Sequence, residues 1–251
     1  MENTDLNKAS SSTLENNNTL SPEVWIKEGE SYTMKPEIRE RLLEISNDFY
    51  EFLNLEIPLL DITLTGSLSN YNYSQYSDFD LHLIINYDDV DADHELVEDF
   101  FNMKKTIWNT RHDITIKDFE VEVYAQDSNE PHHSTGVYSV ENDKWEVEPK
   151  KEDPKIDKNE VYKKSKSWAK QITNIERFYK KGKYDKVISL VDKLKEKLKK
   201  YRSAGLDGVG EYAIENLVFK VLRRSGYIER LNDMKEDSYD EKMTIKEYNK
   251  K

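Results

Sequence analysis

The sequence predicts a mixed α/β (α+β) protein in which a small mixed β-sheet domain is followed by a helical bundle domain. Strand-length apolar runs alternate with helical patterns up to about residue 150, and only helical patterns follow. The charge changes sign at the same point: residues 1–150 hold 11 Lys and Arg against 32 Asp and Glu, whereas residues 151–251 hold 27 against 18. We therefore expect a leader over residues 1–20, a sheet domain over 21–150 and a basic helical domain over 151–251.

The first 20 residues predict a disordered leader. They are rich in Ser, Asn and Thr and lack the apolar core of a signal peptide. Apolar runs elsewhere are only strand-sized, and the chain has no cysteine. Membrane-spanning proteins, disulfide scaffolds and thiolate zinc sites are therefore excluded as classes, and we expect a cytoplasmic protein without a membrane partner.

The elements of the sheet domain begin with an amphipathic helix, predicted over residues 35–55 with Pro36 in its first turn. Strands are expected over residues 57–65 and 79–85, because both runs are short and apolar. The Tyr- and Ser-rich stretch between them is too polar for the core and predicts a turn.

A second helix is expected over residues 91–110. Its predicted apolar side chains are Leu96, Val97, Phe100, Phe101, Met103 and Ile107. Residues 114–124 then alternate with period two and predict a hairpin around Lys117 and Asp118.

The second half of the chain predicts a linker and then helices. Residues 142–157 are charged and contain two prolines, which favours a linker or a wrapping segment. Three apolar stripes at helical spacing follow, over residues 161–179, 184–201 and 213–222. Gly182 and Gly205 are expected to end helices.

The chemistry of the chain is concentrated where the first two strands of the sheet domain end. Thr65-Gly66-Ser67 is followed, after ten residues, by Asp78-Phe79-Asp80. Strand alternation puts both aspartates on one face, about 7 Å apart along the backbone. Carboxylates so placed can share two divalent ions, which stabilise the attacking and leaving oxygens in nucleotidyl transfer. A glycine lets the backbone approach a phosphate, and Ser67 offers a hydroxyl donor.

A third acid is expected on the neighbouring strand. Glu120 and Glu122 both point to one face of the run 119–124, and we favour Glu122 because it lies deeper in that run. An acid pair alone would be common in so acidic a chain. The combination of a Gly-Ser turn, fixed spacing and strand context is much more specific.

These residues carry a resemblance to a known family. The chain resembles the DNA polymerase β superfamily of nucleotidyltransferases in one signature. The residues that match it are Gly66-Ser67, then, after ten further residues, Asp78-Phe79-Asp80, and a later strand acid. Predicted nucleotidyltransferases often carried by bacteriophages resemble the chain over most of its length, through residues 121–127, 133–139, 204–212 and 215–220.

The resemblance implies a two-metal enzyme that moves a nucleoside monophosphate from a nucleoside triphosphate, such as ATP, to a hydroxyl, with release of pyrophosphate. Asp78 and Asp80 would bind Mg²⁺ or Mn²⁺, Glu122 would bind metal near the acceptor hydroxyl, and Gly66 and Ser67 would hold the β and γ phosphates. If the chain is phage-encoded, its expected location is the host cytoplasm.

The acceptor is left open by the sequence. An RNA or tRNA end, a protein side chain, a small molecule such as an aminoglycoside and a second nucleotide are all compatible with it. The alternative to an enzyme is a catalytically silent nucleotide- or RNA-binding module, or an antitoxin-like partner, with the same fold. The intact acids favour the enzyme.

Several other residues are weaker candidates. His82 shares the face of the two aspartates, but a strand histidine is more often only packed and hydrogen-bonded. His132 and His133 lack further ligands at metal spacing. The candidates for base stacking are Tyr71, Tyr73 and Tyr76 in the polar turn. The candidates for phosphate binding in the basic domain are Lys163, Lys164, Lys166 and Lys170.

Overall fold

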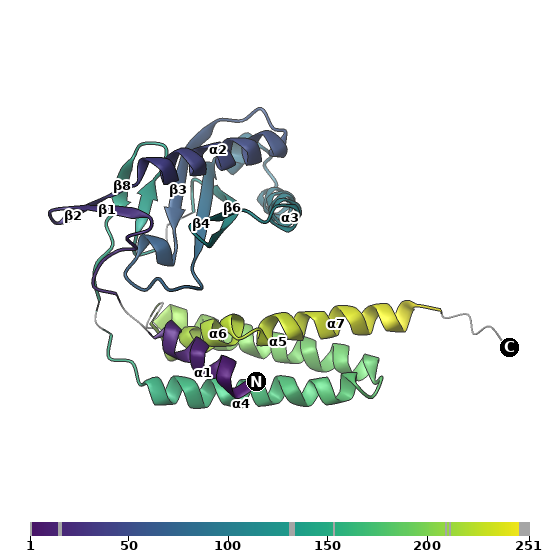
Figure 1. Cartoon of the computed structure of the whole chain (residues 1–251). Helices are drawn as coiled ribbons and strands as arrows, with labels where there is room; N and C mark the ends of the chain where they lie inside the picture. The colour runs from purple at the N-terminus through teal and green to yellow at the C-terminus, as the bar shows by residue number, and fades with distance from the viewer. Residues whose placement is uncertain are drawn as a thin grey trace. The chain divides into compact units, whose positions relative to one another are not determined.

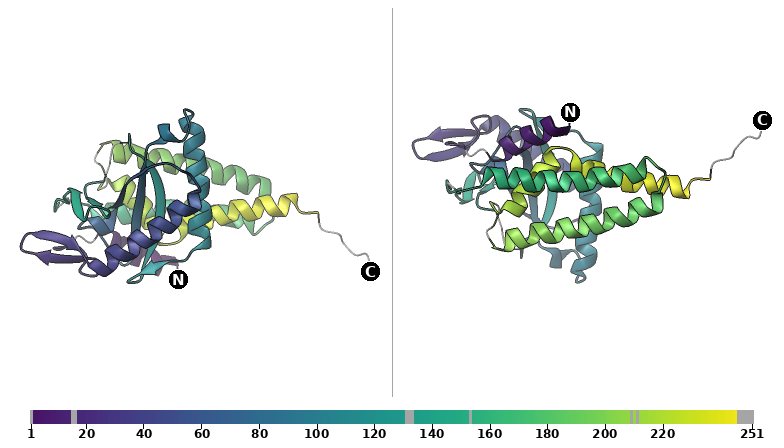
Figure 2. Two further views of the ribbon diagram at one scale, coloured as in Figure 1. Left: turned by 90° about the horizontal axis from the view of Figure 1, so that it is seen from above. Right: turned by 90° about the horizontal axis from the view of Figure 1, so that it is seen from below.

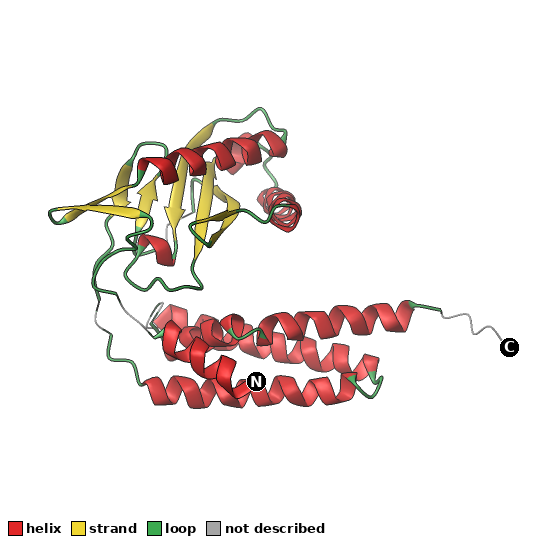
Figure 3. Cartoon of the chain, in the orientation of Figure 1, coloured by secondary structure: helices red, strands yellow, loops and turns green. Residues whose placement is uncertain are grey.

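The structure is a computed structural model that describes residues 2–14, 17–130, 134–152, 154–208, 210 and 212–245. The chain divides into two compact units (Figure 1). The sheet unit is Glu15–Asp153, and the helical unit combines Met1–Leu14 with Pro154–Lys251. Strands are confined to the sheet unit among the residues described, so the predicted mixed α/β class with a helical region after the sheet is confirmed (Figure 3).

The sheet unit is built on a six-stranded sheet with the order β5-β6-β4-β3-β7-β8. Its strands are β3 (Leu59–Thr65), β4 (Asp78–Ile85), β5 (Thr115–Ile116), β6 (Phe119–Asp127), β7 (Val137–Ser139) and β8 (Lys144–Val147). β4 pairs parallel with β6, and the other neighbours are antiparallel. A separate ribbon is formed by β1 (Trp25–Glu28) and β2 (Ser31–Met34).

Strand alternation decides which side of the sheet becomes the core. Along β4, Phe79, Leu81 and Leu83 are fully buried, while the residues between them are only partly buried. The buried face packs with the apolar side chains of α2 (Pro36–Leu53), which crosses the strands in the left view of Figure 2. This packing leaves Asp78 and Asp80 on the opposite face, away from the apolar core.

The predicted hairpin around Lys117 and Asp118 is confirmed. Both residues have positive φ, at 51° and 65°, between the paired strands β5 and β6. A turn with two such residues matches the twist of the strands that it joins. The remaining helical elements of this unit are η1 (Ser67–Ser69), η2 (Tyr87–Asp89) and α3 (His94–Arg111).

The helical unit is held by one apolar core. Its helices are α1 (Glu2–Thr13), α4 (Lys158–Tyr179), α5 (Tyr184–Gly208), α6 (Ile214–Arg224) and α7 (Tyr227–Met243). Gly182 lies between α4 and α5 with φ of 64°, as expected for a helix end. Within the described residues, no helix is both long and apolar enough to cross a membrane.

The predicted disordered leader is wrong for residues 2–14. They form α1, and Leu6, Ala9 and Leu14 are buried in the core of the helical unit. Their spacing matches a helix, and tertiary packing supplies the stability that this polar segment lacks alone. The helical unit therefore draws on both ends of the sequence.

Three further expectations need correction. Gly205 lies inside α5, where a β-carbon would stand 2.7 Å from Cβ of Glu215, so it permits close packing of α5 and α6. The predicted linker over residues 142–157 contains β8. On α3 the buried residues are Val97, Phe101 and Trp108, whereas three predicted core residues are exposed, namely Leu96, Met103 and Ile107.

Candidate active site

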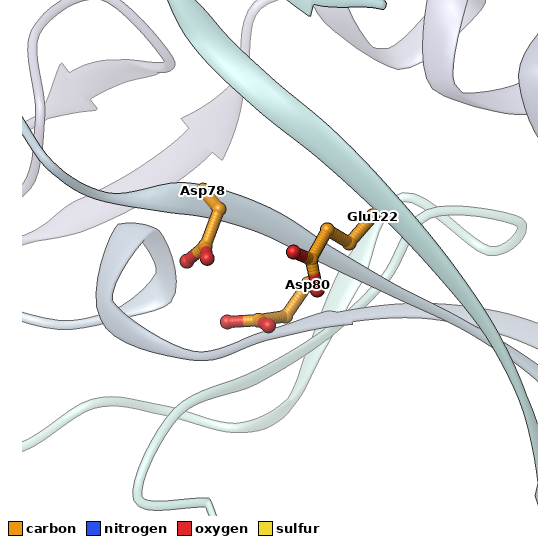
Figure 4. Close-up of side chains that lie close together, drawn as sticks. All are labelled: Asp78, Asp80 and Glu122. Carbon is orange, nitrogen blue, oxygen red and sulfur yellow. The ribbon is translucent and has the colours of Figure 1, made fainter. Parts of the chain in front are cut away.

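Three carboxylates meet on the side of the sheet opposite its core. One oxygen each from Asp78, Asp80 and Glu122 lies within 4.8 Å of the others, and all three side chains are partly buried (Figure 4). Three oxygen ligands at this separation are a donor set that suits Mg²⁺ or Mn²⁺. Like charges so close repel one another, so a bound cation would stabilise the group.

The parallel pairing of β4 with β6 explains why these acids converge. Asp80 lies opposite Glu122 in the register, and Asp78 lies opposite Glu120. Glu120 is nevertheless exposed and lies outside the cluster. Of the two glutamates that the sequence offers, Glu122 is therefore the one close to both aspartates.

The Gly-Ser turn lies directly beside the cluster. β3 ends at Thr65, which pairs with Asp80, and Gly66 follows with φ of 75°. A β-carbon at Gly66 would stand 1.8 Å from Oδ2 of Asp80. Only glycine accommodates both this backbone conformation and the close carboxylate.

Serine side chains tie this turn to the start of β4. The hydroxyls of Ser67 and Ser77 lie 2.7 Å apart, and Ser69 donates to the carbonyls of Leu64 and Thr65. Because Ser77 immediately precedes Asp78, the bond fixes the turn relative to the first acid. The hydroxyl of Ser67, expected to face phosphate, thus already has a partner inside the protein.

Tyr124 extends the site along β6. Its hydroxyl donates a hydrogen bond to Glu122. Its ring stacks on His82, with centroids 5.0 Å apart, and Nζ of Lys105 lies 3.8 Å from the centroid of the same ring. His82 is in turn 3.2 Å from the hydroxyl of Thr65, measured from Nε2.

The titration behaviour of these groups follows from burial and charge. Burial raises the pKa of Tyr124, and the hydrogen bond to Glu122 and the negative charge of the acids raise it further. Burial lowers the pKa of Lys105, against the opposite effect of Glu122 and Asp80. Tyr124 therefore remains a hydrogen-bond donor to Glu122. Lys105 is a basic side chain whose pKa responds to the charges of Glu122 and Asp80.

β5 pairs only with the first two residues of β6, and beyond them α3 contacts this edge of β6. The side-chain amide of Asn109 donates to the carbonyl of Val123 and accepts from its N–H, both at 3.2 Å. These two bonds satisfy the groups that an edge strand would otherwise expose. They also fix α3 beside Glu122 and Tyr124, with Lys105 one turn before Asn109.

The other predicted candidates belong to other parts of the chain. Tyr71 and Tyr73 pack against the core of the sheet unit, and their carbonyls accept from the side chain of Asn17. Lys163, Lys164, Lys166 and Lys170 lie on α4 in the helical unit, where Lys164 contacts Glu160 at 2.9 Å. His132 and His133 lie outside the described residues.

Sequence reasoning missed Lys105, Asn109 and Tyr124. Tyr124 follows Glu122 by two residues and shares its face, so alternation along the strand was a usable signal. Lys105 and Asn109 are four residues apart on one helix, but nothing local shows that this helix lies along β6.

No protein-family model matches the chain, and no curated protein matches it. Among solved structures, it is similar to the STING-associated CdnE c-di-GMP synthase from Capnocytophaga granulosa, with 17% identity and a TM-score of 0.22. The match covers 83% of this chain and 84% of that chain.

Proposed function

We propose that the protein is a metal-dependent nucleotidyltransferase of the polymerase β kind. The observation that carries this proposal is the convergence of Asp78, Asp80 and Glu122 beside Gly66, whose φ is positive. An acid cluster alone would fit many cation sites. Its position against a Gly-Ser turn adds a place where phosphate oxygens can approach the backbone.

The reaction is attack of an acceptor hydroxyl on the α-phosphorus of a nucleoside triphosphate. The new bond joins the acceptor oxygen to the α-phosphorus, and the bond from that phosphorus to the bridging oxygen breaks as pyrophosphate leaves. Two Mg²⁺ or Mn²⁺ ions, when bound, would neutralise charge on the attacking and leaving oxygens.

The protein residues have separate tasks in this proposal. Asp78 and Asp80 hold metal, and Glu122 completes the metal shell and takes the proton of the acceptor hydroxyl. The amides of Gly66 and Ser67 hold the β and γ phosphates. Tyr124 orients Glu122, to which it donates, and Lys105 contributes positive charge near the acids.

The test is incubation of the purified protein with each α-³²P-labelled nucleoside triphosphate and Mg²⁺ or Mn²⁺, with total RNA, protein or small-molecule extracts. Labelled product that disappears in Asp78→Asn/Asp80→Asn supports the proposal, and the labelled fraction identifies the acceptor class. Product formed equally by the variant would refute it. Nucleotide binding without product under any condition would favour the silent binding module.

A further inference from the structure

Helix α3, which lies along β6 (Figure 1), carries two apolar stripes, of which one is buried and the other is largely exposed. Val97, Phe101 and Trp108 are buried in the core of the sheet unit. A second set of apolar side chains recurs along the same helix at spacings of four, three and four residues, namely Leu96, Phe100, Met103 and Ile107. A surface helix of a globular protein typically has one apolar stripe and a polar opposite face. The second stripe therefore requires a separate explanation.

The exposed stripe of α3, defined as Leu96, Phe100, Met103 and Ile107, is open to solvent over most of its length. Leu96 is 60% exposed, Met103 61% and Ile107 41%, while Phe100 is half-buried. Single exposed apolar residues need no explanation, but a continuous row of them marks an interaction surface. Alternating spacings of three and four residues are the pattern by which two helices interlock their side chains along a shared seam. The exposed stripe therefore fits another helix.

The charges beside the exposed stripe are segregated along α3. Glu95 and Asp99 adjoin it in the first half of the helix, and Lys104 and Arg111 adjoin it in the second half. A second copy of α3 in antiparallel orientation brings the acidic half of each helix to the basic half of the other. A parallel copy would instead place like charges together, which is unfavourable. The charge pattern thus favours an antiparallel pair of identical helices.

We propose that the exposed stripe of α3 is a dimer interface, on which α3 of a second copy of this chain packs antiparallel. A two-fold axis through the middle of the stripe places Leu96 of each copy near Ile107 of the other, and Phe100 near Met103. All these contacts join apolar side chains, so the stripe is complementary to itself. Lys105 contacts Tyr124 from the other side of α3, so the dimer leaves the acid cluster accessible.

Sedimentation of the full-length protein tests the dimer, over concentrations from about 1 to about 300 μM. An interface of one helix pair is small, so its dissociation constant is expected in the micromolar range. Wild type should change from monomer to dimer as its concentration rises. Met103→Glu should abolish the dimer, because it places two like charges within the apolar seam. The matched control is Met243→Glu, on α7, where the methionine is 55% exposed, and this variant should dimerise as wild type does.

Cysteine cross-linking tests the orientation of the two helices. The chain contains no cysteine, so one introduced thiol reports one position. Leu96 and Ile107 are eleven residues apart, which is about 16 Å along the helix, and a disulfide requires Cα atoms within about 7 Å. Oxidation of a mixture of Leu96→Cys and Ile107→Cys should therefore join the two variants to each other and neither variant to itself.

A wild-type protein that stays monomeric throughout this concentration range, or a dimer that persists in Met103→Glu, would overturn the proposal. Cross-linking of Leu96→Cys to itself, without cross-linking to Ile107→Cys, would overturn the antiparallel arrangement. Neither experiment involves a nucleotide or a metal ion, so a negative result leaves the proposed function unaffected.

Discussion

Gly66 and Asp80 are in such close contact that any side chain at position 66 would occupy the place of the carboxylate. A β-carbon at this position would stand 1.8 Å from Oδ2 and 2.8 Å from Cγ of Asp80. The pairing of Thr65 with Asp80 fixes this approach from the backbone side. The turn and the acid are thus one structural feature, and a change at Gly66 must displace Asp80.

Gly66→Ala should therefore abolish metal binding while the protein still folds. Gly66 has φ of 75° and ψ of -159°, a conformation nearly confined to glycine, so alanine there costs roughly 1–3 kcal/mol of backbone strain, and the flexible Asp80 side chain must rotate away. Gly29→Ala is the matched control, because Gly29 also has a positive φ of 65° but a β-carbon there meets nothing within 4 Å. Both variants should lose stability in urea unfolding, Gly66→Ala at least as much as Gly29→Ala because Asp80 must also move, and only Gly66→Ala should lose Mn²⁺ binding in calorimetry. Retained Mn²⁺ affinity would contradict the close contact.

Glu122→Gln should raise the melting temperature without divalent metal and remove the stabilisation that metal provides. The first effect comes from relief of repulsion within the cluster. At a metal concentration ten times the dissociation constant, wild type should gain about 1.4 kcal/mol. Thermal melts with and without MnCl₂ measure both effects.

The control for this change is Glu120→Gln, on an exposed residue outside the cluster. It should melt as wild type does in both conditions. A loss of metal stabilisation in Glu120→Gln rather than in Glu122→Gln would reassign the third acid.

Tyr124→Phe should flatten the alkaline loss of stability. The pKa of Tyr124 is raised above its usual value of 10.0, so above that pH the unfolded chain releases a proton that the folded protein retains. Stability due to this tyrosine is therefore complete below pH 10 and falls as pH rises, by at most about 1.4 kcal/mol per pH unit. Urea unfolding from roughly pH 9 to 11 measures the slope.

The stability of Tyr124→Phe should fall less steeply with pH than that of wild type, because the variant lacks the Tyr124 proton. Tyr87 and Tyr138 also have raised pKa values, but they are present in both proteins and contribute equally to both slopes. Tyr239→Phe, at an exposed side chain, should keep the wild-type slope. Identical slopes in wild type and Tyr124→Phe would show that the folded protein does not hold the Tyr124 proton.

The parts of the site that could be predicted from the sequence are those set by residues close together in the chain. The face shared by Asp78 and Asp80 follows from alternation along β4, and the turn at Gly66 follows from composition. Lys105 and Asn109 could not be predicted, because the path of α3 along β6 is set by non-local hydrogen bonds to Val123. Glu122 was preferred over Glu120 for its depth in the run 119–124, and Glu122 is the glutamate that lies in the cluster.

The same division applies to the fold. The helix over Pro36–Leu53 was predicted because its buried side chains recur at helical spacing. On α3 the apolar residues surround much of the helix, and tertiary contacts bury Val97 and Trp108 rather than Leu96 and Met103. In α1 the apolar residues are so few that the polar composition of the segment predicted disorder instead of a helix.

Leu6→Ala tests whether the first helix belongs to the core of the helical unit. Leu6 is 1% exposed, and the hydroxyl of Thr13 accepts a hydrogen bond from Arg224 of α6 at 3.0 Å. Loss of a buried leucine side chain should reduce the free energy of unfolding by about 3 kcal/mol. Native-state hydrogen exchange of the backbone amides of α6, against which α1 packs, measures this loss of stability. The control is Lys8→Ala, at an exposed residue of α1, which should leave the exchange rates unchanged. If Leu6→Ala exchanged as slowly as wild type, α1 would not be part of that core, and the basic helices would be stable without the N-terminal segment.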